Sequence, residues 1–546
     1  MIALLFALAL LASLFAGWRI MRRTRFFLHV FQLETYKLGR YAQWCTSHIT
    51  DAVVRMSHVA GVLILAGMAT GFSVLSPPWV AGTAFVLWTG AFISSRRYRS
   101  DREKKPLAFT SRMTRLAGTA GGLSALPVVV GGWTAIAAAQ TGDLTGSFWF
   151  LVGLFAADLG APLWVGIAAV LMTPVEQVIQ DGYKRDARTH LAQRPDLHVI
   201  GITGSYGKTS TKFILAEILR QRYNVLSTPS SYNTPMGICI VVNNKLRPEH
   251  QVLVLEYGIR YPGDIRELTD IARPDTSVVT TIGLAHLETM GSQDAIAQEK
   301  GYLVKDTAAG GPSVLNFDDP RVEAMRDRAQ GTVWGVSLEG HPEAQITASN
   351  IRFDTSGTRF TVRDDTGAEA HFQTRLLGRH NVLNILLAVA VGRSMGLRLR
   401  AMAHALRRVE PVEHRLALQD NGNITIIDDA FNSNPIGARN AVEILGQMGG
   451  GRRVIVTPGM VELGERQWAE NKTLGSYIAE QEIDLAVLVG PEQTEPIREG
   501  LREAHYPDEQ TKVFASLFDA QDFLTSYLQS GDIVLYENDL PDQLEE

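Results

Sequence analysis

The hydrophobic pattern divides the chain into two parts. The long uncharged runs of the first 175 residues lie at 2–18, 58–95 and 116–140. A further apolar segment, 148–172, is interrupted by Asp158 and Pro162. Uncharged runs of 17 or more residues match the thickness of a lipid hydrocarbon core, and Pro77 marks a turn within the longest run. The pattern predicts an α-helical membrane domain over residues 1–175, with about five transmembrane helices.

Basic residues indicate how such a domain is oriented. Residues 19–55 hold seven Lys or Arg and residues 96–115 hold eight, whereas segment 139–146 holds none. Positive charge favours the cytoplasmic side, so we expect the N-terminus outside and everything after Met172 in the cytoplasm. The segment 19–55 is also rich in aromatic residues, which is typical of a chain at the headgroup boundary. These features predict a multi-pass protein of the inner or plasma membrane.

The same residues bear on two alternatives, a cleaved signal peptide and a large soluble core. A cleaved signal peptide would place positive charge before the first run, whereas Arg19 and Arg22 follow it, which favours an uncleaved anchor. Core helices of a large soluble protein are rarely uncharged over such lengths. Asp158 needs an explanation, because an ionisable residue at bilayer depth faces a partner or a cavity. It either contacts a polar ligand or caps a helix that ends before Pro162.

The second half alternates between strand and helix patterns, after a linker helix expected over residues 176–197. Residues 198–203 (HVIGIT) predict a buried strand, and the sequence GSYGKTSTK leads into an apolar-periodic helix that ends near Tyr223. A glycine-containing loop between a strand and a helix is typical of a phosphate-binding site. The alternative is an ordinary strand-to-helix turn, since Gly201 lies six residues before Gly207 rather than the usual five.

Each part of this loop suits a nucleotide triphosphate. Backbone amides around the glycines can face phosphate oxygens, the lysine supplies a positive charge, and a hydroxyl can ligate Mg²⁺. The residues expected to bind nucleotide here are Gly204, Ser205, Gly207, Lys208, Thr209 and Ser210.

Two further strand ends carry candidate chemistry. A strand over 252–255 ends in Glu256, whose carboxylate can hold a metal beside the phosphate loop. A strand over 277–282 is followed by His286 and, 14 residues later, Lys300. Taken alone, a histidine or lysine in such a position is more often structural than catalytic.

The remainder of the chain predicts a β-rich excursion and a second nucleotide-type fold. Residues 332–376 alternate polar and apolar positions within a central domain over 198–410, and a helix begins at His380. The C-terminal domain, 411–546, predicts an open, Rossmann-like parallel sheet. Its expected strands are 424–427, 454–456, 485–489 and 533–536.

Composition excludes some classes of function. The net charge of -5, with basic clusters confined to the apolar half, gives no reason to expect a nucleic-acid partner. Two cysteines, Cys45 and Cys239, are too few for a disulfide framework or a cysteine metal site.

From residue 198 onward the chain resembles the Mur ligase superfamily, and most closely its MurF branch. Eight ordered matches are far more specific than any single motif. They are GITGSYGKTSTK (201–212), SYNTPMGI (231–238), LEYGIRYPGDI (255–265), AHLETMGS with the following EKG (285–301), LLGRHNVLN (376–384), HRL (414–416), DDAFNSNP (428–435) and ENDLP (537–541).

The resemblance implies an ATP-dependent acid–amino-acid ligase. In that family ATP phosphorylates a carboxylate, and an amine then displaces phosphate to form an amide. The resemblance assigns Thr209 and Glu256 to a first Mg²⁺ and His286 to a second, with Lys300 carrying a CO₂-derived carbamate that supplies metal-binding oxygens. Lys208, His286 and Lys300 are the expected catalytic residues.

The resemblance also implies nucleotide and substrate contacts outside the loop. Asn384 would read the adenine edge, although Asn381 could instead cap the helix and leave Asn384 a surface amide. Arg415 would reach the ATP phosphates, and Asp429 would contact the nucleotide or its metal. The substrate-binding residues implied are Asn233, Thr234, Asn432 and Asn434.

The N-terminal half departs from the family pattern. A soluble MurF begins with a domain that binds the uridine diphosphate end of its precursor, and here the predicted membrane domain takes that place. The acyl acceptor is therefore either lipid-linked or UDP-linked, and the amine is an amino acid or a dipeptide. We expect a ligase of cell-envelope or peptidoglycan precursor synthesis at the cytoplasmic membrane face. A polyglutamate-type ligase and an ATP-driven transporter or scaffold, supported by Asp158, are the alternatives.

Overall fold

The structure is a computed structural model of the chain. It describes residues 2–72, 77–94, 107–229, 232–410, 416–420, 422–430, 435–461 and 463–538. The chain forms two compact units, Met1–Gly182 and Tyr183–Glu546. The boundary between them falls inside one helix, a few residues after the expected end of the N-terminal domain at 175.

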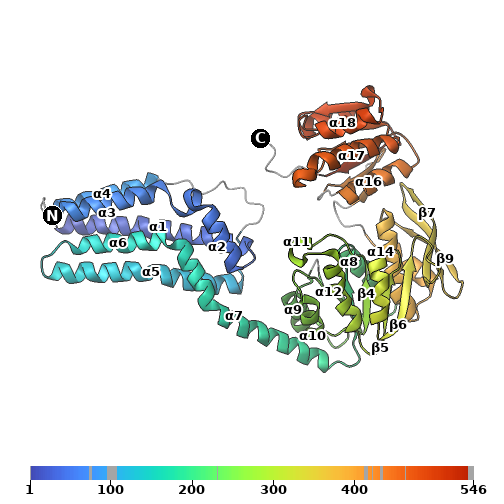
Figure 1. The fold of residues 1–546 in the computed structure, drawn as a ribbon, viewed down its shortest axis with the longest axis horizontal. Coiled ribbons are helices and arrows are strands. Elements are labelled where there is room, and N and C mark those ends of the chain that lie inside the picture. The colour runs from blue at the N-terminus through green and yellow to red at the C-terminus, as the bar shows by residue number, and fades with distance from the viewer. Residues whose placement is uncertain are drawn as a thin grey trace. The chain divides into compact units, whose positions relative to one another are not determined.

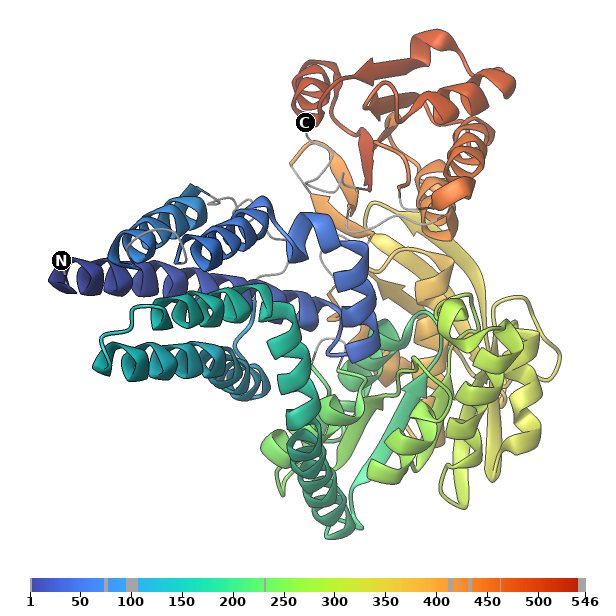
Figure 2. The same ribbon diagram turned by 60° about the vertical axis from the view of Figure 1, so that its left-hand side comes forward.

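The first unit consists of helices. They are α1 (Ile2–Leu33), α2 (Leu38–Ser47), the π-helical turn Ile49–Val53, α3 (Met56–Gly71), α4 (Pro77–Ser94), α5 (Ser111–Gln140), α6 (Gly146–Leu159) and α7 (Ala161–Ala192). Figures 1 and 2 both show α5 and α6 running side by side, and α1 packs against α4, α5 and α6. Among the described residues, α5 and α7 are long and apolar enough to cross a membrane, while α3 and α6 are shorter apolar helices.

The helices of this unit differ in extent from the apolar runs. The run 2–18 is the first part of α1, which continues through the basic residues to Leu33. The segment 148–172 is two helices, since the chain bends at Gly160. A Cβ atom there would lie 2.6 Å from the Ala156 carbonyl oxygen, so only glycine fits this close turn. The expected linker helix over 176–197 is the last part of α7, which ends at Ala192.

Asp158 is the centre of a buried polar cluster that ties three helices together. Its carboxylate oxygens accept hydrogen bonds from Nε of Arg19 on α1, at 3.0 and 3.1 Å. His58 on α3 accepts from the Arg55 amide at Nδ1, so its Nε2 carries the proton and donates to Asp158 at 2.8 Å. Arg23 donates to the Asp158 carbonyl oxygen at 2.8 Å. The carboxylate is thus held by protein partners and does not cap α6.

The central part of the second unit is a nine-stranded sheet in the order β2-β3-β1-β4-β5-β6-β7-β8-β9. Its strands are β1 (His198–Thr203), β2 (Val225–Ser227), β3 (Val252–Glu256), β4 (Thr276–Val279), β5 (Gly310–Asn316), β6 (Gly331–Ser337), β7 (Ile346–Asp354), β8 (Gly357–Asp364) and β9 (Glu369–Thr374). Strands β2 to β7 pair in parallel and the last two pair antiparallel. The β-rich segment 332–376 therefore extends this sheet.

Helices cover both faces of this sheet. They are α8 (Lys208–Leu219), α9 (Pro235–Lys245), α10 (Asp264–Ile271), α11 (Leu287–Met290), α12 (Gln293–Lys305), α13 (Pro320–Glu323), α14 (Arg379–Ser394) and α15 (Leu399–Leu406). Ile200 and Ile202 of β1 pack into one buried cluster with α8 and α14, whereas Val199 packs into the opposite cluster with α10 and α12. Residues alternate between the faces of a strand, so β1 is buried on both sides and holds the following loop rigidly.

The C-terminal part contains a six-stranded sheet in the order β10-β11-β15-β12-β13-β14. Its strands are β10 (Ala417–Asp420), β11 (Thr425–Asp429), β12 (Arg453–Thr457), β13 (Leu485–Val489), β14 (Thr511–Phe514) and β15 (Ile533–Glu537). Its helices are α16 (Pro435–Gln447), α17 (Gln467–Glu480), α18 (Glu495–Glu503) and α19 (Leu517–Tyr527). The four predicted strands are present, whereas the two edge strands were not expected: β10, which is antiparallel, and β14, which is parallel.

Candidate active site

The loop between β1 and α8 is shaped by two glycines with positive φ. Gly207 has φ 80°, and a Cβ atom there would lie 2.4 Å from Oδ1 of Asn384. At Gly204, with φ 147°, a Cβ atom would lie 1.8 Å from Oγ1 of Thr280. The loop therefore needs glycine for both conformation and space. Its backbone amides precede a helix N-terminus, which is a favourable place for an anion.

Lys208 bridges the loop from its first helical turn. Its ammonium donates to the carbonyl oxygens of Gly204, at 2.6 Å, and of Ser205, at 3.3 Å. Burial lowers the pKa of Lys208, while the negative charge of Glu256 opposes this shift. When a nucleotide binds, the Lys208 side chain can give up a hydrogen bond to a carbonyl oxygen and donate to a phosphate oxygen instead. The bond to phosphate is charge-assisted and therefore stronger.

Thr209 and Glu256 meet as the sequence predicts. Oγ1 of Thr209 donates to Oε2 of Glu256 at 3.1 Å, although 47 residues separate them. The parallel pairing of β1 with β3 brings them together, because Ile202 and Glu256 are register partners. A hydroxyl and a carboxylate at this separation fit as ligands of one Mg²⁺ ion.

Lys212 is a site residue that the sequence interpretation did not assign. Its Nζ lies 2.7 Å from Oε1 of Glu256, and neither side chain is exposed. Desolvation lowers the pKa of Lys212, and Glu256 opposes that shift. Lys212 follows Lys208 by four residues on α8, hence on the same helix face, and this spacing was the signal that could have identified it.

Lys300 reaches the same loop from α12. Its Nζ donates to the Gly204 carbonyl oxygen at 3.0 Å, so this oxygen accepts from the amino groups of two lysines. Burial, followed by repulsion from Lys208, holds the pKa of Lys300 well below its usual range. The neighbouring Glu299 does not pair with it, because its carboxylate accepts from the amides of Gly263 and Ile265 at the start of α10.

His286 follows β4 in the left-handed conformation, with φ 70°, directly before α11. Partial desolvation lowers the pKa of His286, and the positive charges of Lys300 and Lys208 add to this effect. The imidazole is thus close enough to sense both lysines and favours its neutral, metal-binding form. No three His, Cys, Asp or Glu side chains converge on a metal site anywhere in the described part of the chain. A metal held by Thr209 and Glu256, or one held by His286, would therefore need further ligands that are not side chains of these four types.

Asn384 lies against the phosphate loop. It is 4% exposed, and its Oδ1 accepts from Thr211 on α8 at 3.2 Å. Its amide donates to Asn381, whose own amide donates to the Leu377 carbonyl oxygen at 2.7 Å. Asn384 is therefore not a surface amide, and adenine reading by this residue stays a prediction.

The expected substrate residues of the central part directly precede α9. Asn233 contacts the backbone at Gly258, whose amide donates to the Asn233 carbonyl oxygen at 2.9 Å. Thr234 caps α9, with its hydroxyl oxygen accepting from the Gly237 amide at 3.2 Å. Thr234 thus has a structural role, and substrate contact by either residue remains a prediction. Ser210 is half-buried in the first turn of α8.

Asp429 ends β11 in the C-terminal part. Its Oδ1 accepts from the Leu416 amide at 3.1 Å, which fixes the chain directly after position 415. Arg415, Asn432 and Asn434 lie outside the described residues, so their predicted roles stay predictions.

Two family models match the chain in order. The Mur ligase middle domain matches residues 202–392, and the Mur ligase, glutamate ligase domain matches residues 407–536. Together they cover more than half of the chain.

Curated relatives carry the name UDP-N-acetylmuramoyl-tripeptide--D-alanyl-D-alanine ligase. The Mycobacterium tuberculosis protein is 35% identical over 302 residues, which are 54% of this chain and 58% of the relative. The Bacillus subtilis protein is 28% identical over 351 residues, 64% of this chain and 74% of the relative. The chain thus spans little more than half the length of its mycobacterial relative.

Solved structures of MurF proteins are also similar to this chain. MurF from Acinetobacter baumannii superposes with a TM-score of 0.57 at 27% identity, covering 66% of this chain and 77% of that one. MurF ligase from Thermotoga maritima in complex with ADP has a TM-score of 0.56 at 25% identity. The match covers 66% of this chain and 80% of that one.

Proposed function

Because this chain belongs to the Mur ligase family through its middle and C-terminal domains, we propose that it is an ATP-dependent amide ligase of the MurF type. It would act in peptidoglycan precursor synthesis, joining an amine to the carboxylate of a muramoyl peptide. The curated relatives named for this reaction support the assignment.

The observation that carries the proposal is the meeting of Thr209 and Glu256 beside a loop contacted by two lysines, Lys208 and Lys300. A carboxylate that attacks the γ-phosphate of ATP brings anions together, so positive charge must neutralise them first. Lys208 would hold the β- and γ-phosphates, while Thr209 and Glu256 would hold Mg²⁺. Bound Mg²⁺ would supply further charge neutralisation at the transferred phosphoryl group.

Lys300 fits a further part of this proposal. An ammonium cannot ligate a metal, but an unprotonated amine can react with CO₂ to give a carbamate with two anionic oxygens. The lowered pKa of Lys300 favours the unprotonated amine. His286, whose lowered pKa favours the neutral ring, would share a second Mg²⁺ with that carbamate. Small carboxylate anions should partly restore activity to Lys300→Ala if this assignment holds.

We further propose that the first unit lies in a membrane, with its basic end in the cytoplasm. In the most apolar 18-residue stretch of each helix, only 11% of the residues of α5 and 17% of those of α7 are buried. Core helices of a soluble protein are mostly buried. Large apolar side chains such as Leu63, Trp133 and Val178 are 67%, 76% and 74% exposed. An apolar surface of this kind is stable against lipid and unfavourable in water.

The nature of the acceptor follows from the relatives and from the N-terminal unit. The relatives' names specify a UDP-linked muramoyl tripeptide and D-alanyl-D-alanine, which are the first substrates to test. A lipid-linked acceptor is the second substrate to test, because an apolar helical unit precedes the ligase domains. The transporter alternative has lost its main support, since Asp158 is held by Arg19 and His58.

The test is product analysis by mass spectrometry. Detergent-solubilised full-length protein is incubated with ATP, Mg²⁺, each acceptor and either D-alanyl-D-alanine or glutamate. We expect phosphate release that depends on the amine, together with one new amide. Lys208→Ala should abolish the product, whereas Lys245→Ala, which changes an exposed lysine on α9, should not. Phosphate release without an amide product would refute the ligase proposal.

A further inference from the structure

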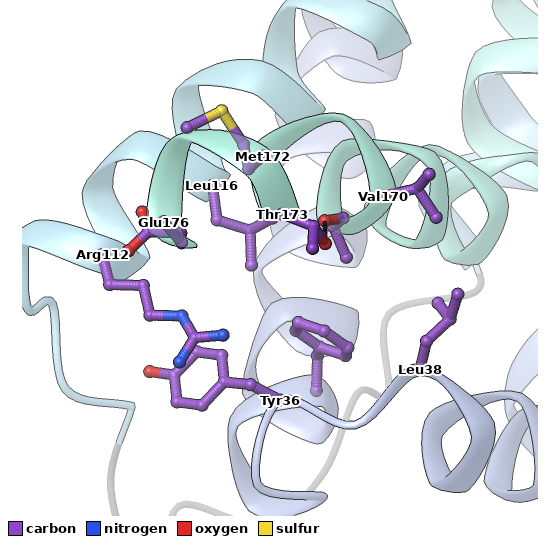
Figure 3. A pocket seen from close by; sticks show the side chains of 10 residues that line it. Tyr36, Leu38, Arg112, Leu116, Val170, Met172, Thr173 and Glu176 are labelled. Atoms are coloured by element: carbon purple, nitrogen blue, oxygen red, sulfur yellow. Dashed lines mark hydrogen bonds between the residues drawn. The ribbon is translucent and has the colours of Figure 1, made fainter. Parts of the chain in front are cut away.

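A pocket lies among the helices of the first unit, apart from the residues assigned to ligation. It has a cavity volume of about 70 Å³ and is formed by the end of α1, the turn before α2, the start of α5 and the middle of α7. The residues that line it include Tyr36, Leu38, Arg112, Leu116, Val170 and Glu176. Figure 3 shows Arg112, Tyr36 and Glu176 at one end, with Leu38 and Val170 at the other.

One end of the pocket is apolar and open to the surroundings of the bundle. Leu116 is buried, with only 3% of its surface exposed, whereas Leu38 and Val170 are 43% and 54% exposed. Next to the pocket on α7, Leu171 is 53% exposed as well. These aliphatic side chains form a surface that an alkyl or prenyl chain would cover favourably.

The other end is polar and carries one net positive charge. Arg115 and Glu176 form a bidentate ion pair, at 2.8 and 2.9 Å, and neutralise each other. The guanidinium of Arg112 instead lies over the ring of Tyr36, 4.2 Å from its centroid. Within the described residues Arg112 has no carboxylate within 4.0 Å, so its donors are available to an anion. It stands in the first turn of α5, where the helix dipole also favours negative charge.

We propose that this pocket binds an anionic lipid, with its phosphate at Arg112 and its chain along Leu38, Leu116 and Val170. The inference rests on the proposed membrane placement of the first unit. A free phosphate would leave the aliphatic end uncovered, and an uncharged lipid would leave the guanidinium without a partner. Arginine pairs with phosphate through a two-pronged, charge-assisted contact, which fixes both position and orientation.

Native mass spectrometry of the full-length protein in mild detergent tests the proposal. The protein is mixed with phosphatidic acid and phosphatidylcholine of identical chains, with or without inorganic phosphate. We expect about tenfold preferential retention of phosphatidic acid, corresponding to one charge-assisted contact. Millimolar inorganic phosphate should not displace it.

Variants locate the binding. Arg112→Gln should reduce the preference to about equal retention. Arg22→Gln is the matched control, because Arg22 also stacks on an aromatic ring, that of Trp18 at 4.9 Å, but is exposed and outside the pocket. Thr173→Trp fills the pocket mouth from an exposed position of α7 and should lower retention of both lipids. Both pocket variants must match the wild-type elution volume and helical circular dichroism.

Several results would overturn the proposal. They are equal retention of the two lipids by the wild type, unchanged preference in Arg112→Gln, and displacement of phosphatidic acid by inorganic phosphate. The last result would identify a free-anion site. Amide synthesis is assayed on the same samples, so lipid retention without amide product counts against the ligase alone. Amide product without lipid retention counts against the pocket alone.

Discussion

Nζ of Lys212 lies 2.7 Å from Oε1 of Glu256, and both side chains are fully buried. Removing one partner of such a pair leaves an uncompensated buried charge, which costs about 3–5 kcal/mol. We expect Lys212→Met to lower the free energy of unfolding by about 3 kcal/mol in urea titrations. Lys245→Met, on an exposed lysine, should be nearly neutral. Adding Glu256→Gln to Lys212→Met should recover part of the lost stability, because it also removes the unpaired charge. A double variant that is no more stable than Lys212→Met alone would contradict the pairing.

A second prediction concerns Gly207, which is compared with Gly263. Both have a positive φ, 80° and 96°, but a Cβ atom at Gly263 meets nothing within 4 Å. Gly263→Ala should therefore lower the free energy of unfolding by about 1 kcal/mol, through conformational strain alone. Gly207→Ala also displaces Asn384 and should weaken ADP binding by about tenfold or more in calorimetry. Equal effects of the two substitutions on ADP binding would show that the contact with Asn384 is unimportant.

A third prediction concerns pH. The pKa of Lys300 is lowered by burial and by Lys208, so the unfolded chain binds a proton that the folded chain releases. Between the lowered pKa and the ordinary value of roughly 10.4, the stability of the folded protein must rise with pH. We expect Lys300→Met to flatten this rise in urea unfolding of metal-free protein between pH 6 and 9. Lys305→Met, on an exposed lysine of the same helix, should keep the wild-type slope.

A fourth prediction concerns the N-terminal unit. Asp158→Asn removes the charge that balances Arg19 and should destabilise this unit by about 3 kcal/mol. That is a loss of roughly 10 °C in the melting temperature in mild detergent. Asp143→Asn, in an exposed loop, is the control and should melt with the wild type. An unchanged melting temperature for Asp158→Asn would mean that the cluster contributes little to stability.

The ligase half was largely predictable because its signals are local. The strand before the loop was placed at its observed residues, and Thr209 and Glu256 meet because β1 and β3 pair in parallel. The role of Lys212 was missed, since its partner is 44 residues away and its helical spacing from Lys208 was not used. Strands β10 and β14 were also missed, because edge strands of four residues give no clear alternation.

The N-terminal half was harder to predict. Hydropathy located the apolar segments but could not show that α1 continues through its basic residues or that Gly160 divides the last segment. The partners of Asp158 lie 139 and 100 residues away, on helices whose mutual rotation the sequence does not specify. Contacts of this kind depend on helix packing and not on local pattern.

The shared hydrogen bonds at the Gly204 carbonyl oxygen have a consequence for loading order. Lys208 and Lys300 both donate to that atom, and Lys212 already neutralises Glu256. A lone divalent cation therefore meets net repulsion, whereas a triphosphate is attracted and draws Lys208 away from the carbonyl. Magnesium should accordingly enter as the nucleotide complex, so that the electrostatics of the resting loop determine which ligand arrives first.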